Sequence, residues 1–222
     1  MLRRTLALAA LFGLAACTAA LAEEKEPIEL FNGEDLSGWT YYLVDEDLAM
    51  EDVFTVRDGL IHVVGEPLGY LATEEEFESF KLRVEWRWPE GVEPTNSGVL
   101  MRITGEPMGL PRCIEAQLQH GNAGDIWTFQ GFELAEAEER WRDIDHPELG
   151  RILGIGKIRD AEKAPGEWNL YEITLDGDKL TLKINGELVN EAEGVEVIAG
   201  QIGLQSEGGP IEFRTVELIP LD

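Results

Sequence analysis

Basic residues are scarce in this 222-residue chain, where 18 lysines and arginines stand against 44 aspartates and glutamates, giving a formal net charge of -26. A surface field of that sign repels phosphate backbones and anionic lipid headgroups, so the composition argues against a nucleic-acid-binding protein. The composition does not exclude neutral or cationic partners. A divalent cation is one such partner, although most acidic surfaces are simply solvated.

Cysteine is almost absent, with only Cys17 and Cys113 in the chain. If Cys17 is consumed by processing of the N-terminus, the folded part holds a single thiol and has no intrachain disulfide. Its stability must then come from a hydrophobic core. No Cys-His motif surrounds Cys113, so we expect a small buried residue there rather than a nucleophile.

Long apolar runs are also missing, except for one near the N-terminus. Residues 1–22 carry Arg3 and Arg4, then an apolar stretch, then small residues, which is the layout of a secretory signal peptide. The stretch is too short to span a bilayer. It predicts an exported protein, with a short tether at 23–29 and one folded domain at 30–222.

The signal region offers two cleavage sites. Leu14–Cys17 resembles a bacterial lipobox, in which cleavage precedes a lipid-modified cysteine, and this favours a lipoprotein tethered to the membrane through Cys17. The alternative is cleavage after Ala22, which would release a periplasmic protein that begins at Glu23.

Helical periodicity is nearly absent, and short alternating or apolar runs follow one another from Ile28 onward. This rhythm is typical of an all-β protein with two packed antiparallel sheets. Asp-Gly or Asn-Gly pairs at 58–59, 176–177 and 185–186 separate strand candidates where a tight turn needs a positive φ. The predicted strands are 53–57, 60–64, 70–72, 80–88, 98–103, 113–118, 169–175, 179–184, 187–190, 200–206 and 211–218.

One segment, from Gly131 to Pro165, is too long for a simple strand connection. Such long connections are often functional, so we expect an excursion with one short helix near the mouth of a site. It contains Asp143, Asp145 and His146, whose spacing is only weakly typical of a metal site. We therefore predict no metal ligands and no required cofactor, while a divalent cation stays open.

Six ordered motifs resemble one family, the 3-keto-disaccharide hydrolase domain, also described as a 3-keto-glucoside 1,2-lyase or 3-keto-2-hydroxyglucal hydratase domain. The resemblance covers residues 30–221 and implies a concanavalin A-like jelly roll, whose concave face holds a sugar. The chain departs from the family pattern at Gln119-His120 and at 124–127, which affects substrate choice more than fold. The motifs lie at 30–39, 96–102, 114–117, 166–169, 184–186 and 200–206, followed by Phe213-Arg214.

Alternation along the strand at 80–88 separates an apolar face from a charged face. The apolar face belongs in the core, so we expect the charged face to be the open, ligand-binding side, together with polar residues of two further strands. The predicted substrate-binding residues are Glu85, Arg87, Gln117 and Trp127. Trp127 and Trp141 suit stacking on a sugar ring and packing equally well.

The resemblance implies a reaction in which a ketone at C3 acidifies the proton at C2, so that a base removes it and the C1 substituent leaves. Glu115 is the candidate base, and Arg102 is the candidate group that stabilises the enolate. His120 is the candidate acid, or an alternative base. The alternatives are a structural ion pair for Glu115 and an ordinary loop position for His120; His62 and His146 are expected to be structural.

We therefore expect a carbohydrate-active lyase or hydrolase that receives 3-keto-glycosides from a separate sugar 3-dehydrogenase. The alternative is a non-catalytic carbohydrate-binding module or surface lipoprotein, because one fold can host either role. Binding modules rely mainly on aromatic stacking surfaces, so an expected site rich in arginine and glutamate favours the enzyme.

Overall fold

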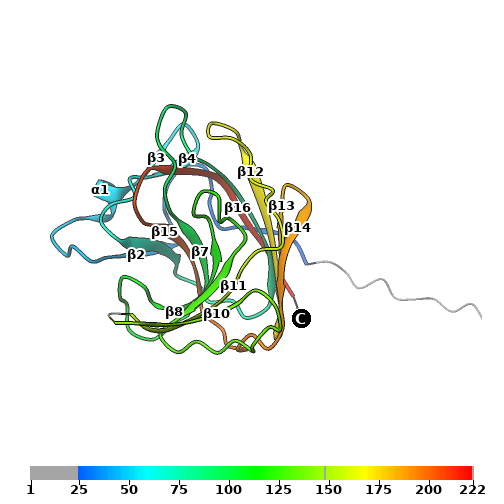
Figure 1. The fold of residues 1–222 in the computed structure, drawn as a ribbon. Coiled ribbons are helices and arrows are strands. Elements are labelled where there is room, and N and C mark those ends of the chain that lie inside the picture. Colours follow the sequence, from blue (N-terminus) through cyan, green and yellow to red (C-terminus); the bar gives the residue numbers. More distant parts are fainter. Residues whose placement is uncertain (1–24, 148, 222) are drawn as a thin grey trace, which may run out of the picture.

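The computed structural model describes residues 25–147 and 149–221, which form two antiparallel sheets and one short helix (Figure 1). The signal peptide and lipobox predicted within residues 1–22 lie outside the described residues. In chain order the elements are β1 (Ile28–Glu29), β2 (Trp39–Leu43), α1 (Met50–Val53), β3 (Phe54–Arg57), β4 (Leu60–Val63), β5 (Gly69–Thr73), β6 (Phe80–Arg87), β7 (Gly98–Thr104), β8 (Arg112–Gln117), β9 (Ile126–Phe129), β10 (Trp141–His146), β11 (Gly150–Ile155), β12 (Asn169–Asp176), β13 (Lys179–Ile184), β14 (Glu187–Ala192), β15 (Gln201–Ser206) and β16 (Ile211–Pro220).

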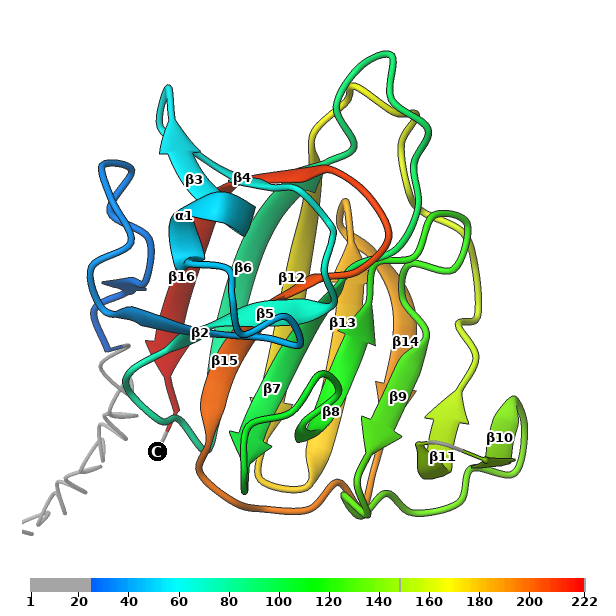
Figure 2. The ribbon, with the colours of Figure 1, turned by 90° about the vertical axis from the view of Figure 1, so that its left-hand side faces the viewer.

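The two sheets lie face to face, and Figure 2 shows one in front of the other. The first, which we call sheet A, has the order β14-β13-β12-β6-β16-β4-β3, with β1 added against β16. The second, sheet B, has the order β10-β11-β9-β8-β7-β15-β5-β2. Strands far apart in sequence are neighbours in both sheets, as in the jelly roll that the family resemblance implies.

The core fills the space between the sheets, because alternate residues of each strand point inward. On β6 the inward side chains Leu82, Val84 and Trp86 are completely buried. Those of sheet B include Val99, Met101 and residues 114 and 116 of β8. This is the close-packed layer of a two-sheet sandwich.

The eleven strands predicted from sequence are all present, with ends that differ by a few residues. The predicted turns are present as well: Asp58, Gly59, Gly177, Asn185 and Gly186 all have φ between 53° and 83°. The sequence reading missed β1, β2, β9, β10 and β11. It also misplaced the helix, which is α1 before β3, whereas residues 131–165 contain the β10–β11 hairpin.

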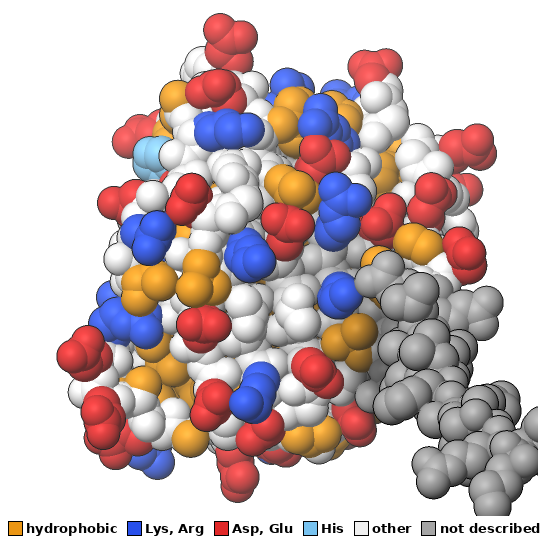
Figure 3. Space-filling view, turned by 90° about the vertical axis from the view of Figure 1, so that its right-hand side faces the viewer, with side chains coloured by type: hydrophobic (Ala, Val, Ile, Leu, Met, Phe, Trp, Pro, Cys, Tyr) orange, Lys and Arg blue, Asp and Glu red, His pale blue; other side chains and the backbone are white. Residues whose placement is uncertain are grey.

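The charged face of β6 lies on the outside of sheet A, and this corrects the expectation that it forms the ligand-binding side. Figure 3 shows side chains of both charges scattered over one face of the molecule. Glu85 pairs with Arg214 and accepts a hydrogen bond from Thr215 at 2.6 Å. Arg87 donates to Glu212 at 2.6 Å and stacks on Trp168. The period of a strand shows which residues share a face, but it does not show which sheet the strand joins.

No helix among the described residues is long and apolar enough to cross a membrane.

Candidate functional site

The outer face of sheet B carries a second apolar cluster, separate from the main core. The strands of sheet B curl around this face, which is the near side of the molecule in Figure 2. A pocket of about 230 Å³ opens there. It is lined by Asn96, Leu110, Glu115, Gln117, Trp127, Phe129, Ile144, His146, Leu149, Ile152 and Glu207.

Glu115 lies at the centre of this pocket, on β8 between β7 and β9. Its side chain is only 1% exposed, and its Oε1 atom meets no hydrogen-bond partner among the described residues. Gly98 on β7 makes room for it, because a Cβ atom on Gly98 would stand 1.9 Å from Glu115 Oε1. The Oε1 atom is therefore packed tightly against the β7 backbone, and the fold leaves it without a hydrogen bond.

Burial raises the pKa of Glu115 well above its usual range, and the nearby carboxylates of Glu207 and Asp125 raise it further. The protonated form of Glu115 is therefore favoured. The alternative of a structural ion pair for this residue finds no support, since no arginine or lysine pairs with Glu115 in the described part of the chain.

Glu207 is a second carboxyl group in the pocket, which the sequence reading missed. It directly follows β15, and a backbone bridge joins it to Asn96. Burial raises the pKa of Glu207, while the hydrogen bond from the Asn96 side chain acts in the opposite direction by favouring the carboxylate. Its only sequence signal was its position directly after the motif at 200–206.

Gln117 adds a polar group of fixed orientation to the pocket. Its Oε1 atom accepts hydrogen bonds from the backbone N–H groups of Leu118, at 2.9 Å, and Gln119, at 2.8 Å. Because the amide oxygen is fixed by these two N–H groups, the Nε2 group at the other end of the amide has a fixed direction and two N–H donors. Gln117 can therefore donate into the pocket that it lines.

Trp127 forms one wall of the pocket and is held in place by its neighbours. Gly154 on β11 lies directly opposite, where any Cβ atom would stand 2.5 Å from the indole. The guanidinium of Arg142 lies 5.1 Å from the ring centre and pairs with Asp125 at 2.7 Å. Trp127 therefore lines the pocket as predicted, whereas Trp141 packs against the main core.

Arg102 lies away from this pocket, so the expectation that it shares a face with Glu115 is wrong. The β7–β8 register shifts between Met101 and Thr104, and Arg102 sits in that irregularity with φ of 53°. A bulge of this kind turns side chains away from the regular alternation. The fully buried guanidinium donates to three backbone carbonyls, those of Glu78, Gly177 and Glu196.

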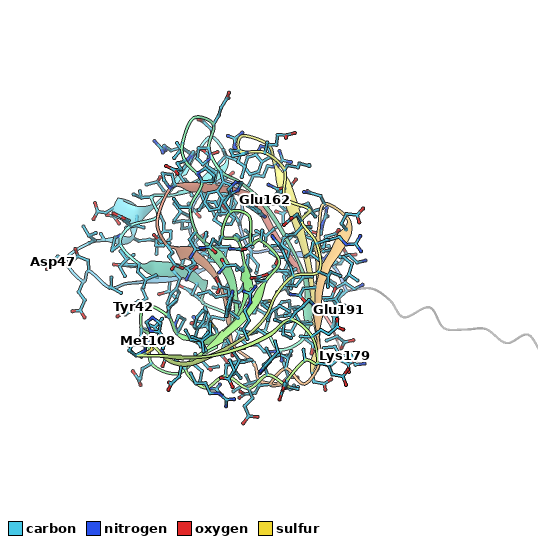
Figure 4. The ribbon with its side chains drawn as sticks, viewed as in Figure 1. Tyr42, Asp47, Met108, Glu162, Lys179 and Glu191 are labelled. Carbon is cyan, nitrogen blue, oxygen red and sulfur yellow. The ribbon has the colours of Figure 1, made fainter. Side chains whose placement is uncertain are left out.

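His120 is also outside the pocket. Its Nδ1 atom lies 2.8 Å from Glu162 Oε1, which also accepts a hydrogen bond from Trp88. Figure 4 shows Glu162 at one end of the sandwich, well separated from Tyr42 and Met108 beside the open face of sheet B. The partner of His120 is thus a loop carboxylate, in line with the loop position that the sequence left as the alternative.

His146, expected to be structural, lines the pocket instead. It is the last residue of β10, and its Nδ1 atom accepts the backbone N–H of Leu149 at 3.2 Å, which places a proton on Nε2. The excursion at 131–165 therefore reaches the mouth of a pocket, as predicted, but through a hairpin. The other histidine, His62, lies 3.1 Å from Glu212 on the outside of sheet A.

The apolar cluster on this face extends beyond the residues that line the pocket. Tyr42 stacks on Tyr70 with ring centres 5.9 Å apart, and burial raises the pKa of Tyr70 to about 12. Cys113 lies in the same cluster and is a buried free thiol, as predicted. Within residues 25–147 and 149–221 there is no group of three histidine, cysteine, aspartate or glutamate side chains arranged to hold a metal ion.

The other hollows of the surface lack this combination of features. Three are larger, at about 400, 510 and 660 Å³; one lies beside Met50 and Phe54, and the other two lie beside residues 131–137 and the edge of sheet A. Among the described residues, none of the three is lined by a buried titratable side chain. The pocket around Glu115 is therefore the candidate site: a small hollow with aromatic walls and two carboxyl groups, on the outer face of sheet B.

The chain belongs to the family described as the 3-keto-alpha-glucoside-1,2-lyase-like domain, whose model matches residues 26–219. The protein thus has a carbohydrate-active role and a lyase-like domain. None of the curated proteins matches the chain in sequence.

Several solved structures share the fold at low sequence identity. A protein from Parabacteroides distasonis classed with the glycosyl hydrolases has a TM-score of 0.63 at 20% identity, covering 88% of this chain and 94% of its own. The carbohydrate-binding module CBM66 from Bacillus subtilis has a TM-score of 0.60 at 11% identity, covering 81% and 94%. A Bacillus licheniformis β-glucanase has 0.56 at 12% identity, covering 90% and 100%.

Proposed function

We propose that this protein cleaves glycosides that carry a ketone at C3, by removing the proton at C2 and eliminating the substituent at C1. Water then adds to the unsaturated sugar, so the net reaction is hydrolysis. The observation that carries the proposal is Glu115, a buried residue that lines a pocket and whose Oε1 atom, packed against Gly98, has no hydrogen-bond partner. Buried carboxyl groups of this kind are costly to keep and are typical of acid–base catalysis.

The size and lining of the pocket fit one sugar ring. Its volume of about 230 Å³ lies below the roughly 300–1,000 Å³ of sites for larger ligands. Trp127 and Phe129 provide aromatic surface, while Gln117, Asn96 and the two carboxyl groups provide polar contacts. Apolar walls with a few directed polar groups are the usual design of a small-molecule site.

The growing negative charge on the C3 oxygen needs a hydrogen-bond donor. The sequence reading gave this task to Arg102, whose guanidinium is occupied by backbone carbonyls elsewhere. No lysine or arginine lines the pocket within the described part of the chain. We therefore assign the task to the Nε2 group of Gln117, which is oriented by the two N–H groups bound to its Oε1 atom.

The proposal extends to the setting of the reaction. We propose that the protein is exported through the signal at residues 1–22, and that Cys17 tethers it to the membrane. Its substrate must come from an enzyme that oxidises C3 of a glycoside, since intact sugars lack the ketone. A sugar 3-dehydrogenase is the class that performs that step.

The test is to incubate the purified protein with methyl 3-keto-glucoside and to follow the release of methanol. Wild type should turn over, and Glu115→Gln should lose about 10²- to 10⁴-fold in kcat, the usual range for loss of an acid–base group. Glu212→Gln is the matched control, because Glu212 is also buried but lies on sheet A, and it should stay within a few-fold of wild type.

A non-catalytic carbohydrate-binding role is the second candidate, and the aromatic wall formed by Trp127 and Phe129 favours it. Binding of an unoxidised glycan, measured by calorimetry, with no turnover of any 3-keto-glucoside would support that role and would contradict the proposed enzyme.

A further inference from the structure

The pocket contains two carboxyl groups in different environments, and this difference divides the work between them. Glu115 is 1% exposed and packs against Gly98 of the β7 backbone, with one oxygen atom unpartnered. Glu207 is only half-buried and bridges to Asn96, whose side-chain hydrogen bond favours its charged form. Two carboxyl groups placed in such unlike settings commonly take opposite roles, one as acid and one as base.

Proximity strengthens this division. The two side chains line the same small pocket, and each carboxylate disfavours a second negative charge nearby. The state in which one of the two carboxyl groups is protonated is therefore favoured over the state in which both are ionised. That proton belongs on the group with less hydrogen bonding to its charged form, which is Glu115.

We propose that Glu207 is the base that removes the proton from C2, and that Glu115 is the acid that protonates the oxygen leaving C1. This assignment rests on the function proposed above and reverses the role that the sequence alone suggested for Glu115. It adds to the site a residue that no motif of the sequence analysis had singled out.

The proposed step balances in atoms and electrons. The Glu207 carboxylate takes the C2 proton, and the C–H electron pair forms an enolate whose oxygen at C3 is bound by Gln117. When the enolate collapses, the C3 ketone re-forms, a double bond forms between C1 and C2, and the C1–O bond breaks. The departing oxygen takes the proton of Glu115. Hydration reverses these proton transfers. A water molecule gives a proton to the Glu115 carboxylate while the hydroxyl of that water adds to C1. Glu207 then returns its proton to C2.

Proton removal can be measured separately from bond cleavage. A 3-keto sugar with no substituent at C1, 3-keto-1,5-anhydroglucitol, has no leaving group there, so exchange of its C2 proton in D₂O reports the base alone. The exchange is followed by proton NMR. Wild type and Glu115→Gln should both catalyse it, whereas Glu207→Gln should lose about 10²-fold or more.

Leaving-group dependence tests the acid. A nitrophenolate leaves without protonation, so Glu115→Gln should cleave nitrophenyl 3-keto-glucoside within about tenfold of wild type while losing at least 10²-fold on the methyl glycoside. Glu207→Gln should lose on both substrates. His146→Gln is the comparison variant, because His146 is the remaining titratable side chain that lines the pocket among residues 25–147 and 149–221.

The outcomes separate this inference from the function on which it rests. If wild type neither exchanges the C2 proton nor cleaves either glycoside, the proposed function fails. If wild type is active but Glu115→Gln abolishes exchange while Glu207→Gln does not, the roles are those of the sequence reading and the inference is overturned. A loss of exchange in His146→Gln, with Glu207→Gln unaffected, would also overturn it.

Discussion

Replacement of Arg102 by lysine distinguishes a structural arginine from a catalytic one. In the structure its guanidinium is completely buried and donates to the carbonyl oxygens of Glu78, Gly177 and Glu196. These carbonyls belong to three separate segments of the chain. Arg102 therefore joins connections at one end of the sandwich, and we expect its loss to affect stability rather than the chemical step.

The size of the effect follows from the hydrogen bonds. A lysine keeps the charge but has one nitrogen in place of three, so one or two of the three carbonyls lose their donor. Leaving a buried acceptor unsatisfied costs about 1–3 kcal/mol, so Arg102→Lys should destabilise the fold by about 2–4 kcal/mol. For a protein of this size each kcal/mol shifts Tm by about 2–4 °C, so Tm should fall by about 4–16 °C.

The assay has two measurements. Calorimetry gives Tm, and methanol release from methyl 3-keto-glucoside, well below the transition, gives kcat. Arg83→Lys is the matched control, since the Arg83 side chain is 49% exposed and its pairing with Glu217 at 3.5 Å is a surface contact of little energetic value. An unchanged Tm for Arg102→Lys together with a 10²-fold loss of kcat would refute the reasoning and restore Arg102 to the catalytic site.

Two further predictions concern Glu115 and the N-terminus. Because the folded-state pKa of Glu115 is raised, the folded protein binds more protons than the unfolded chain, and its stability falls as pH rises above about 4.5, by about 1.4 kcal/mol for each pKa unit of the shift. Glu115→Gln removes this loss, so its Tm relative to wild type should be higher at pH 8 than at pH 4.5; an equal difference at both pH values would contradict the burial argument. At the N-terminus, full-length protein expressed in a Gram-negative host should incorporate labelled palmitate and Cys17→Ser should not, whereas a native N-terminus at Glu23 would rule out the lipid anchor.

The sandwich was predictable because most strands alternate strictly and are bounded by turn residues. Residues 80–87 of β6 alternate between buried and exposed or half-buried positions, and the Asn185-Gly186 turn marks the β13–β14 hairpin clearly. The strand β10 was missed for the opposite reason. Its six residues are all exposed or only half-buried, so Trp141–His146 has no buried face to produce a pattern.

The site was only partly predictable, because the sheet that each strand joins and the direction of side chains beyond a strand depend on tertiary structure. Glu115, Gln117 and Trp127 lie together, since regular alternation on β8 and β9 keeps them on one face. Glu85 and Arg87 have the same kind of pattern, but their strand joins the other sheet. Glu207 lies beyond the end of a strand, where alternation says nothing about the direction of a side chain.

Arg102 and Glu115 show how a buried charge reveals its role. They lie on neighbouring strands, both are completely or almost completely buried, and the same family motifs carry both. Arg102 has every donor directed at a carbonyl, so its burial is compensated within the fold. Glu115 has an oxygen with no partner and a pKa that burial moves away from its usual range. A buried polar atom left unpaired costs stability. Unpaired buried atoms also occur in the main core, on Trp86 and Tyr171, so what sets Glu115 apart is that a side chain with such an atom also lines a pocket. That combination is tertiary, and sequence pattern alone does not contain it.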